Sequence, residues 1–381
     1  MQIIDGFGFT EEHELLRDSA RRLLQERCPL EEVRRLSGDE LGYDSSLWKE
    51  IANLGWAGIA VAEEYGGAEL GSLHLALLFE ETGRCVLPSP LLGQTLSGIA
   101  IQCAGDEAQR ARYLPSIAAG ETIATLALTD DTLSWEPEQV GGTAEPTQDG
   151  YSLRGAMTHV LNGPWAERIV APFRCSDSGE LALFVVDVAA SGVAVRPEVG
   201  LDPTRRTARV SFGGGSVSAD ARLAADGQSA LHEIHRRALV LLAAEMAGGA
   251  DGALLLTRDY AIDRKQFGRQ IGSFQAVKHP LAEALMSIEQ ARSLTYAAAA
   301  ELDHAKEASD VLPRMAKARA SDAYFFIGHR AIQFHGGFGF TLDCDAHFFL
   351  KRAIWSRAAL GDASHHRKHL AGELFGDSGI G

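Results

Sequence analysis

Apolar residues recur at helical spacing over roughly residues 10 to 120. In the segment EEHELLRDSARRLLQERC, such residues share one stripe of a helix: Leu15, Leu16, Ala20, Leu23 and Leu24. A second helix is predicted in SSLWKEIANLGWAGIAV, with a serine at its start as the cap. Turn sequences such as EEYGGAELG and LPSPLLG separate the helical segments. The N-terminal part of the chain is therefore predicted to be helical.

Short apolar runs replace the helical spacing between about residues 121 and 225. In chain order these runs are TIATLALT, YSLRGAMTHVL, RIVAPF, LALFVVDV and TARVSFGGG. They are rich in β-branched residues and are separated by Gly, Pro and Asp turns, which is typical of strands. This pattern predicts a β domain in the middle of the chain.

Long helical segments return from about residue 229. The stretch ALVLLAAEMAGGADGALLLTRDYAIDR is apolar around much of its circumference, which indicates a helix buried in a bundle or a subunit interface. Further helices are predicted over 275–303, 310–333 and 343–372. The order helices, sheet, helices predicts an α+β fold. We expect an N-terminal helical domain (1–120), a middle β domain (121–227) and a C-terminal helical bundle (228–381).

Charge and cysteine content narrow the classes of function. The 381 residues carry a formal net charge of -15, which argues against nucleic acid or an anionic membrane surface as the main partner. The five cysteines are scattered, odd in number and never in CxxC spacing, so neither a disulfide framework nor a thiolate zinc site is expected. No uninterrupted apolar run reaches the roughly 18 residues of a membrane span, and the N-terminus lacks a secretory signal pattern. We expect a cytoplasmic protein.

The segment DRKQFGRQIGSFQAVKH follows the long apolar helix and groups Arg264, Phe267, Gly268, Gln275 and Lys278. A glycine permits close approach of the backbone, and an arginine supplies a forked, permanently charged donor, so this group suits a phosphate. A polar connection between two helices explains the same residues equally well.

The segment AIQFHGGFGF places Gly336, Gly337 and Gly339 after a predicted helix that contains Gln333. Its spacing differs from the GxGxxG fingerprint, which follows a strand and opens a helix. A helix end followed by a tight turn is the favoured interpretation, and close approach of a cofactor to these glycines is the alternative.

Taken together, RKQFGRQIGSFQ, QFHGGFGF and AVAEEYGGAELG resemble the acyl-CoA dehydrogenase family of flavoproteins, and the resemblance spans essentially the whole chain. It implies the fold of that family and the FAD-dependent α,β-desaturation of an acyl-CoA thioester, a reaction of lipid metabolism and β-oxidation. It also implies a homo- or hetero-tetramer with FAD lying between two subunits, and electron-transfer flavoprotein or a similar acceptor as the partner.

The resemblance implies a set of contacts to the ADP portion of a flavin held mainly by the neighbouring subunit. By position, these contacts fall to Arg264, Phe267, Gln275, Gln333 and Gly337, and all five residues are present. The half of the flavin site that is donated to a partner therefore looks intact.

The contacts that a subunit makes to its own flavin look altered. The family's threonine-containing strand end corresponds to Leu128 and Thr129. The family's Trp-Ile-Thr strand corresponds to HVL, so His159 stands at the tryptophan position and Leu161 at the threonine position. Leucine has no side-chain hydrogen-bond donor.

The reaction also needs a base, a desolvated carboxylate that removes the α-proton of the thioester. The two positions at which family members carry this glutamate correspond to Leu360 and Ala238. Of the nearby carboxylates, Glu245 is the first candidate for a relocated base and Asp362 the second, while Glu233 lies about a turn before Ala238. A buried Glu245 that is satisfied by an arginine or a backbone partner is the favoured interpretation.

The histidine cluster near the C-terminus is a weak candidate for a metal site. His365 and His369 have the i, i+4 spacing of metal ligands, but the glutamate of HExxH is replaced by His366. A solvated basic helix end, close to the C-terminal dipole or a CoA phosphate, is the favoured interpretation, and no metal is expected.

Three hypotheses of function remain open. The chain is an acyl-CoA dehydrogenase subunit that lacks its base and pairs with a different chain, a self-sufficient homotetrameric enzyme with a relocated base, or a non-catalytic scaffold of the same fold. The acyl group of the substrate is not readable, because pocket shape depends on several helices.

Overall fold

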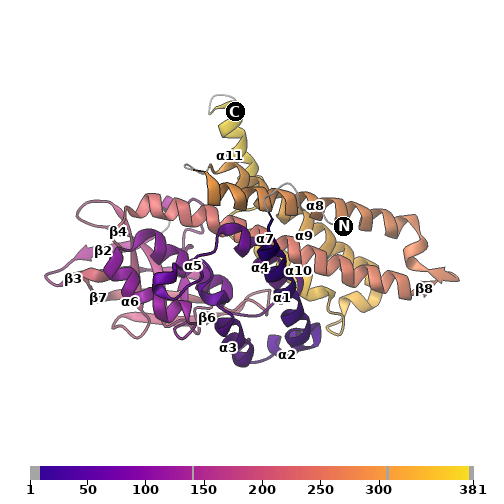
Figure 1. The fold of residues 1–381 in the computed structure, drawn as a ribbon, viewed down its shortest axis with the longest axis horizontal. Helices are drawn as coiled ribbons and strands as arrows, with labels where there is room; N and C mark the ends of the chain where they lie inside the picture. Colours follow the sequence, from indigo (N-terminus) through magenta and orange to yellow (C-terminus); the bar gives the residue numbers. More distant parts are fainter. Residues whose placement is uncertain (1–8, 140, 306–308, 377–381) are drawn as a thin grey trace. The chain divides into compact units, whose positions relative to one another are not determined.

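The computed structural model describes residues 9–139, 141–305 and 309–376 (Figure 1). Contacts between Cα atoms divide the chain into two compact units. The first unit contains Met1–Ser37, Gly71–Leu87 and Arg236–Gly381, and the second contains Gly38–Leu70 and Pro88–His235. The two units are therefore interleaved along the sequence.

The first unit is helical. Its helices are α1 (Glu11–Arg27), α2 (Leu30–Ser37), α4 (Ser72–Arg84), most of α7 (Gly227–Asp263), α8 (Gln275–His304), α9 (Val311–His335), α10 (Ala346–Ala358) and α11 (Ala363–Phe375). A hairpin of β8 (Lys265–Gln266) and β9 (Arg269–Gln270) connects α7 to α8, and it lies at the far end of these two helices in Figure 1. Short 3-10 turns, η5 (Ile271–Ser273) and η6 (Gly336–Phe340), precede α8 and follow α9.

Helix α7 is a core helix of 37 residues. It is long and apolar enough to cross a membrane, but 83% of its most apolar window is buried within the protein. Glycines let α4 approach it closely: a Cβ added at Gly83 would lie 1.9 Å from the carbonyl oxygen of Glu245, and one added at Gly248 would lie 1.8 Å from that of Glu80. The backbones of α4 and α7 therefore meet without intervening side chains.

The second unit combines α3 (Ser45–Asn53), α5 (Leu91–Ala104), α6 (Glu107–Ala118) and the short turns η1 (Trp56–Gly58), η2 (Glu63–Tyr65), η3 (Pro137–Gln139) and η4 (Ala219–Ala221) with a seven-stranded sheet. The strands are β1 (Ala124–Leu126), β2 (Gly142–Pro146), β3 (Gly150–Leu161), β4 (Arg168–Cys175), β5 (Leu181–Asp187), β6 (Val193–Glu198) and β7 (Thr207–Ser218). The strand order is β1-β4-β2-β3-β7-β6, and β5 pairs with β4.

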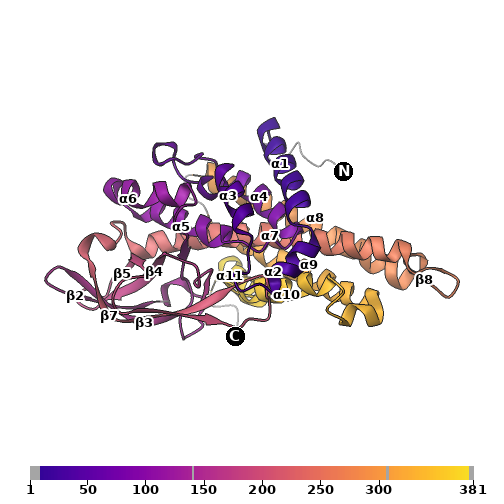
Figure 2. The same cartoon turned by 90° about the horizontal axis from the view of Figure 1, so that it is seen from below.

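Aromatic packing fills the core of this sheet. Phe173 meets Phe184 and Phe212 edge to face, with ring centroids 5.5 and 5.0 Å apart. Figure 2 shows α5 and α6 on one side of the sheet. The amide of Gln94 on α5 donates to the carbonyls of Ile117 and Thr122 and accepts from the backbone N–H of Ala124, which ties α5 to the start of β1.

The predicted α+β order of helices, sheet and helices is confirmed. All five predicted strands form; β2 and β6 of the sheet and the hairpin strands β8 and β9 are additional. The exact boundaries 1–120, 121–227 and 228–381 stay a prediction.

Three local predictions are wrong. The helix expected over 343–372 is two helices, because Leu360 and Gly361 adopt positive φ angles of 58° and 103°. The cap of α3 is Asp44 rather than a serine, since its carboxylate accepts from two backbone N–H groups. The buried face of α1 contains His13, Ala20 and Leu24, whereas Leu15 is 64% exposed.

Candidate functional site

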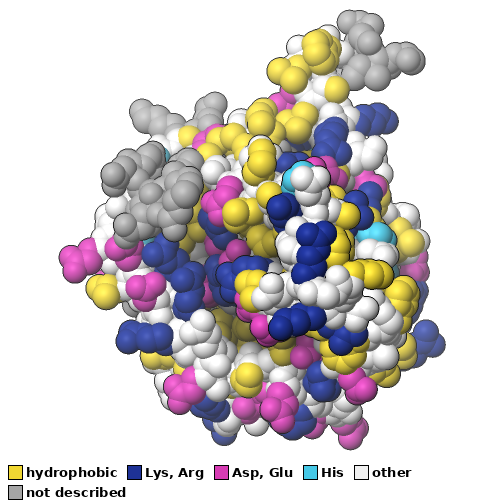
Figure 3. All heavy atoms as spheres, turned by 90° about the vertical axis from the view of Figure 1, so that its right-hand side faces the viewer, with side chains coloured by type: hydrophobic (Ala, Val, Ile, Leu, Met, Phe, Trp, Pro, Cys, Tyr) yellow, Lys and Arg dark blue, Asp and Glu magenta, His cyan; other side chains and the backbone are white. Residues whose placement is uncertain are grey.

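The first predicted flavin-contacting group lies on an exposed hairpin of the first unit. Helix α7 ends at Asp263, and the chain reverses between β8 and β9 through Phe267 and Gly268, whose φ angles are 52° and 80°. Phe267 is 92% exposed, and Arg264 and Gln275 are also exposed. Figure 3 views the structure from the side on which β8 lies in Figure 1, and several Lys and Arg side chains gather on that face. The hairpin thus presents cationic and aromatic groups to solvent.

The second group lies where α9 ends. The helix stops at His335, and Gly336 follows with a φ of 63°, which confirms the predicted helix end and tight turn. Gln333 and Gly337 are both exposed. A Cβ added at Gly337 would meet nothing within 4 Å, and its φ is outside the left-handed region. Nothing within the described chain therefore requires glycine at position 337.

Tyr260 brings these two groups together. It lies one turn before Arg264, its ring stacks on His335 with centroids 4.2 Å apart, and its hydroxyl donates to the carbonyl of His335 at 3.4 Å. The contact joins the end of α7, which precedes Arg264, to the end of α9, which contains Gln333. Tyr260 was not singled out from the sequence. Its position four residues before Arg264 places it on the same side of the helix end as that arginine, which was the available signal.

Leu128, Thr129 and His159 lie in the second unit. The backbone carbonyl of Thr129 accepts from the N–H of Thr158 at 2.9 Å, so the segment after β1 runs beside the end of β3. His159 occupies a bulge with a φ of 53°, its side chain is 58% exposed, and its Nδ1 lies 3.4 Å from Glu198 Oε2. These predicted residues are thus adjacent, but His159 is oriented by a carboxylate.

Glu245 is buried on α7 and is held by an arginine. Its Oε1 accepts from Nη1 of Arg352 on α10 at 2.6 Å, and the two side chains are 2% and 1% exposed. This is the arrangement favoured from the sequence. Ala238, one of the two habitual base positions, is also buried in α7.

Leu360 and Asp362 lie in the turn between α10 and α11. Leu360 is half-buried, and Asp362 caps α11 by accepting from the backbone N–H of His365 at 2.8 Å. The carbonyl of Gly361 accepts from Lys317 Nζ at 2.8 Å. Asp362 therefore serves the local fold as a cap.

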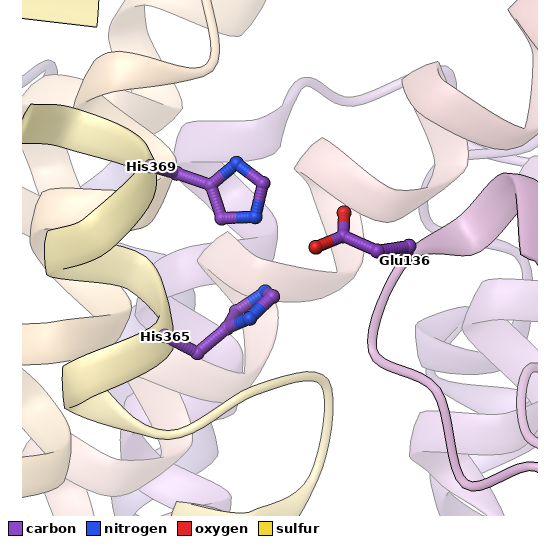
Figure 4. Close-up of side chains that lie close together, drawn as sticks. All are labelled: Glu136, His365 and His369. Carbon is purple, nitrogen blue, oxygen red and sulfur yellow. The ribbon is translucent and has the colours of Figure 1, made fainter. Parts of the chain in front are cut away.

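The histidines lie at the start of α11, not at a helix C-terminus as expected, because the break at Leu360 makes α11 begin at Ala363. His365 and His369 project from successive turns with ring centroids 4.6 Å apart (Figure 4). Glu136, drawn in the same figure, belongs to the other unit. The predicted proximity to a C-terminal helix dipole is therefore wrong, and the alternative, a CoA phosphate near these residues, stays a prediction.

Comparison with known sequences decides the family. The family model "Acyl-CoA dehydrogenase, N-terminal domain" matches residues 10–121, and "Acyl-CoA dehydrogenase, C-terminal domain" matches residues 230–375. The chain belongs to the acyl-CoA dehydrogenase family.

Individual acyl-CoA dehydrogenases match along nearly their full length. Acyl-CoA dehydrogenase IpdE2 of Mycolicibacterium smegmatis is 31% identical over 96% of this chain and 100% of the relative. Among solved structures, a variant of the Tcur3481-Tcur3483 steroid ACAD has a TM-score of 0.87 at 30% identity, covering 96% of this chain and 98% of that one. The ChsE4-ChsE5 complex from Mycobacterium tuberculosis has a TM-score of 0.89 at 26% identity, covering 97% and 98%.

These comparisons confirm the predicted acyl-CoA dehydrogenase fold and class of enzyme, an oxidoreductase that acts on acyl-CoA. FAD is confirmed as the cofactor of this family. The individual site residues are untested and stay predictions.

Proposed function

We propose that this chain is one subunit of a heteromeric, FAD-dependent acyl-CoA dehydrogenase and that a different acyl-CoA dehydrogenase chain supplies the catalytic base. The observation that carries the proposal is that both habitual base positions are apolar and that both candidates for a relocated base, Glu245 and Asp362, serve the local fold. Leu360 and Ala238 are apolar, and Glu245 is engaged by Arg352 within the core. Asp362 caps α11.

The exposed residues of the first unit fit the ADP portion of FAD. Arg264 offers a forked cationic donor suited to a pyrophosphate, and Phe267 offers an exposed ring. Among the described residues, no atom lies within 4 Å of a Cβ added at Gly337, so packing within the chain does not explain this glycine. A glycine at such a position is expected where a ligand must approach the backbone. These groups face outward, as they must if they serve a flavin seated mainly in a partner subunit.

The residues that would serve this chain's own flavin fit less well. Leu161, at the position of the family's hydrogen-bonding threonine, offers no side-chain donor, and its carbonyl already accepts from the hydroxyl of Thr125 at 2.6 Å. His159 points to Glu198 instead of providing a tryptophan surface. This asymmetry supports a subunit that donates flavin contacts and receives few.

Bound FAD would accept the hydride that leaves the β-carbon of the acyl group. In our proposal, this chain contributes Arg264, Phe267, Gln275, Gln333 and Gly337 to orient the cofactor, and the partner chain removes the α-proton. The resemblance of this chain to members of the Tcur3481-Tcur3483 and ChsE4-ChsE5 assemblies supports a heteromer. Electron-transfer flavoprotein or a similar protein would then take up the electrons.

The decisive experiment compares the chain alone with the chain co-expressed with neighbouring acyl-CoA dehydrogenase-like chains. Flavin stoichiometry, native mass and oxidation of acyl-CoA by a dye acceptor are measured for both. We expect the single chain to bind little flavin and to show no turnover. We expect the heteromer to bind flavin and to oxidise acyl-CoA. A yellow homotetramer that turns over acyl-CoA contradicts the proposal and supports a relocated base, whereas no flavin in either preparation supports a scaffold.

Two hairpin variants sharpen this test. Arg264→Met removes the proposed pyrophosphate donor, and Lys265→Met removes a neighbouring exposed cation of the same hairpin. Loss of FAD from the heteromer in the first variant alone supports donation by Arg264. Equal effects in both variants point instead to the general charge of the hairpin.

A further inference from the structure

Lys317 is a fully buried lysine that lies outside both flavin-contacting groups. It projects from α9 with 0% exposure. Its Nζ donates to the carbonyl of Gly361 at 2.8 Å, to Ser321 Oγ at 3.3 Å and to the carbonyl of Arg357 at 3.4 Å. An ammonium group has three N–H donors and a neutral amine has two, so these acceptors can use every donor of Lys317 in either protonation state.

The two carbonyls bracket Leu360. Arg357 lies in the last turn of α10, where backbone carbonyls lack a partner further along the helix. Leu360 has a φ of 58°, which is disfavoured for a residue with a Cβ and persists only where the surroundings impose it. A Cβ added at Gly361 would lie 2.6 Å from the ring of His365 and 2.9 Å from that of His366, so glycine is required there.

We propose that Lys317 is a positioning residue that holds the turn from Arg357 to Asp362, and with it Leu360, in a single conformation. The importance of this turn for acyl-CoA chemistry rests on the proposed function, because Leu360 stands where relatives carry their base. The positioning itself does not depend on a flavin, a substrate or a partner chain.

The charge of Lys317 gives the proposal a measurable signature. Burial lowers the pKa of Lys317 to about 7, although the nearby carboxylate of Asp362 on α11 raises it, and Arg357 on α10 lowers it further. His365 and His366 of α11 adjoin the same turn. Opening the turn exposes the amine to water, where it binds a proton up to a pH of roughly 10.4. The open turn therefore binds more protons, and the closed turn becomes relatively more stable as pH rises from about 7.

The test is hydrogen exchange of the full chain, read by mass spectrometry on peptides covering 355–366 and, as a reference, α8. Lys317→Met keeps the approximate length of the side chain but removes its donors, and Lys49→Met is the control because Lys49 on α3 is exposed. We expect local opening of the turn to increase about tenfold or more in Lys317→Met, with α8 unchanged, and no effect in Lys49→Met.

The pH dependence of turn opening distinguishes positioning by the amine of Lys317 from a role in which the side chain only fills space. After correction for intrinsic exchange, the opening constant of the wild-type turn should fall by up to about tenfold per pH unit between pH 7.5 and 9.5, and that of Lys317→Met should be flat. His365→Gln should retain the wild-type slope. Unchanged protection in Lys317→Met, or a flat wild-type series, overturns the proposal.

A second variant covers failure of Lys317→Met to fold. Ser321→Ala removes one acceptor and should increase opening by about fivefold while retaining the pH slope. No increase in Ser321→Ala together with a flat wild-type series contradicts the proposal. An active homotetramer would defeat the proposed function and leave all of these exchange results unaffected, so the two failures are distinguishable.

Discussion

Oε1 of Glu245 lies 2.6 Å from Nη1 of Arg352, and the pair is buried between α7 and α10. A buried ion pair contributes little net stability compared with well-packed apolar residues, but removal of one partner leaves an isolated charge in the core. The pair therefore gives Glu245 a structural role that is independent of any reaction.

Replacement of Glu245 by glutamine should lower the free energy of unfolding by about 3–5 kcal/mol, because Arg352 then lacks its counter-charge. Urea or guanidinium denaturation of the purified chain measures this loss. The double variant Glu245→Leu with Arg352→Met should recover most of it, since both charges are gone. A Glu245→Gln protein of normal stability that loses turnover would instead identify Glu245 as a base.

Gly83 and Gly98 are helical glycines for which alanine should have opposite effects. At Gly83 the new methyl group would lie 1.9 Å from a backbone carbonyl of α7, so α4 must shift, and we expect a loss of about 1–3 kcal/mol or more. At Gly98 on α5 the nearest atom is 3.5 Å away, and alanine should stabilise the chain by about 0.5–1 kcal/mol. Thermal or chemical unfolding checks both; a neutral Gly83→Ala refutes the close approach.

His13 on α1 and His74 on α4 should make the chain less stable in mild acid. Their rings stack with centroids 3.9 Å apart. Burial lowers the pKa of both below 6.5, and the charge of His74 lowers the pKa of His13 further. The unfolded chain therefore binds more protons, and stability is lost as pH falls through about 6.5. Denaturation midpoints between pH 7.5 and 5 measure the slope, which His74→Gln should reduce and which the exposed-site control His279→Gln should leave intact.

Gly337→Ala should leave the unfolding free energy unchanged, because the added methyl group meets nothing within 4 Å. In the assembled enzyme, it should weaken FAD binding by on the order of tenfold, equivalent to about 1.4 kcal/mol, if the flavin approaches this backbone. Fluorescence titration of the apoenzyme provides the measurement. Gly200→Ala, at another open position, is the matched control, and equal affinity in both variants would argue against contact at Gly337.

The sequence predicted elements whose signals are local. The apolar stretch of α7 and the five β-rich runs were visible because their periodicity depends only on neighbouring residues. The break between α10 and α11 was missed although Gly361 and Asp362 are turn and cap residues, because helix-forming residues on both sides favoured one continuous helix, whereas Leu360 and Gly361 adopt positive φ angles. Because the break was missed, His365 and His369 were expected near a helix C-terminus, whereas they lie in the first turns of α11.

Partners of buried charges were the least predictable features. The pattern around Glu245 indicates a carboxylate within an apolar helix, but Arg352 is 107 residues away and nothing in its own segment, HFFLKRAIW, marks it as the counter-charge. Lys317 is similar, because a lysine in MAKARASD looks like a surface residue until α10 and α11 cover it. Such pairings depend on tertiary packing, which periodicity does not encode.

The interleaving of the two units has a consequence at the ribosome. All residues of the second unit precede residue 236, whereas α1, α2 and α4 belong to a unit whose other helices are synthesised later. Glu80 on α4 accepts from the Arg292 guanidinium at 2.9 Å, and Arg292 is made 212 residues later. At about 5–20 residues per second, α4 waits roughly 10–40 s for this partner. Until then, Arg84 on the same helix is the cation that faces Glu80, at 3.6 Å, and a premature stop before residue 292 releases α4 without Arg292.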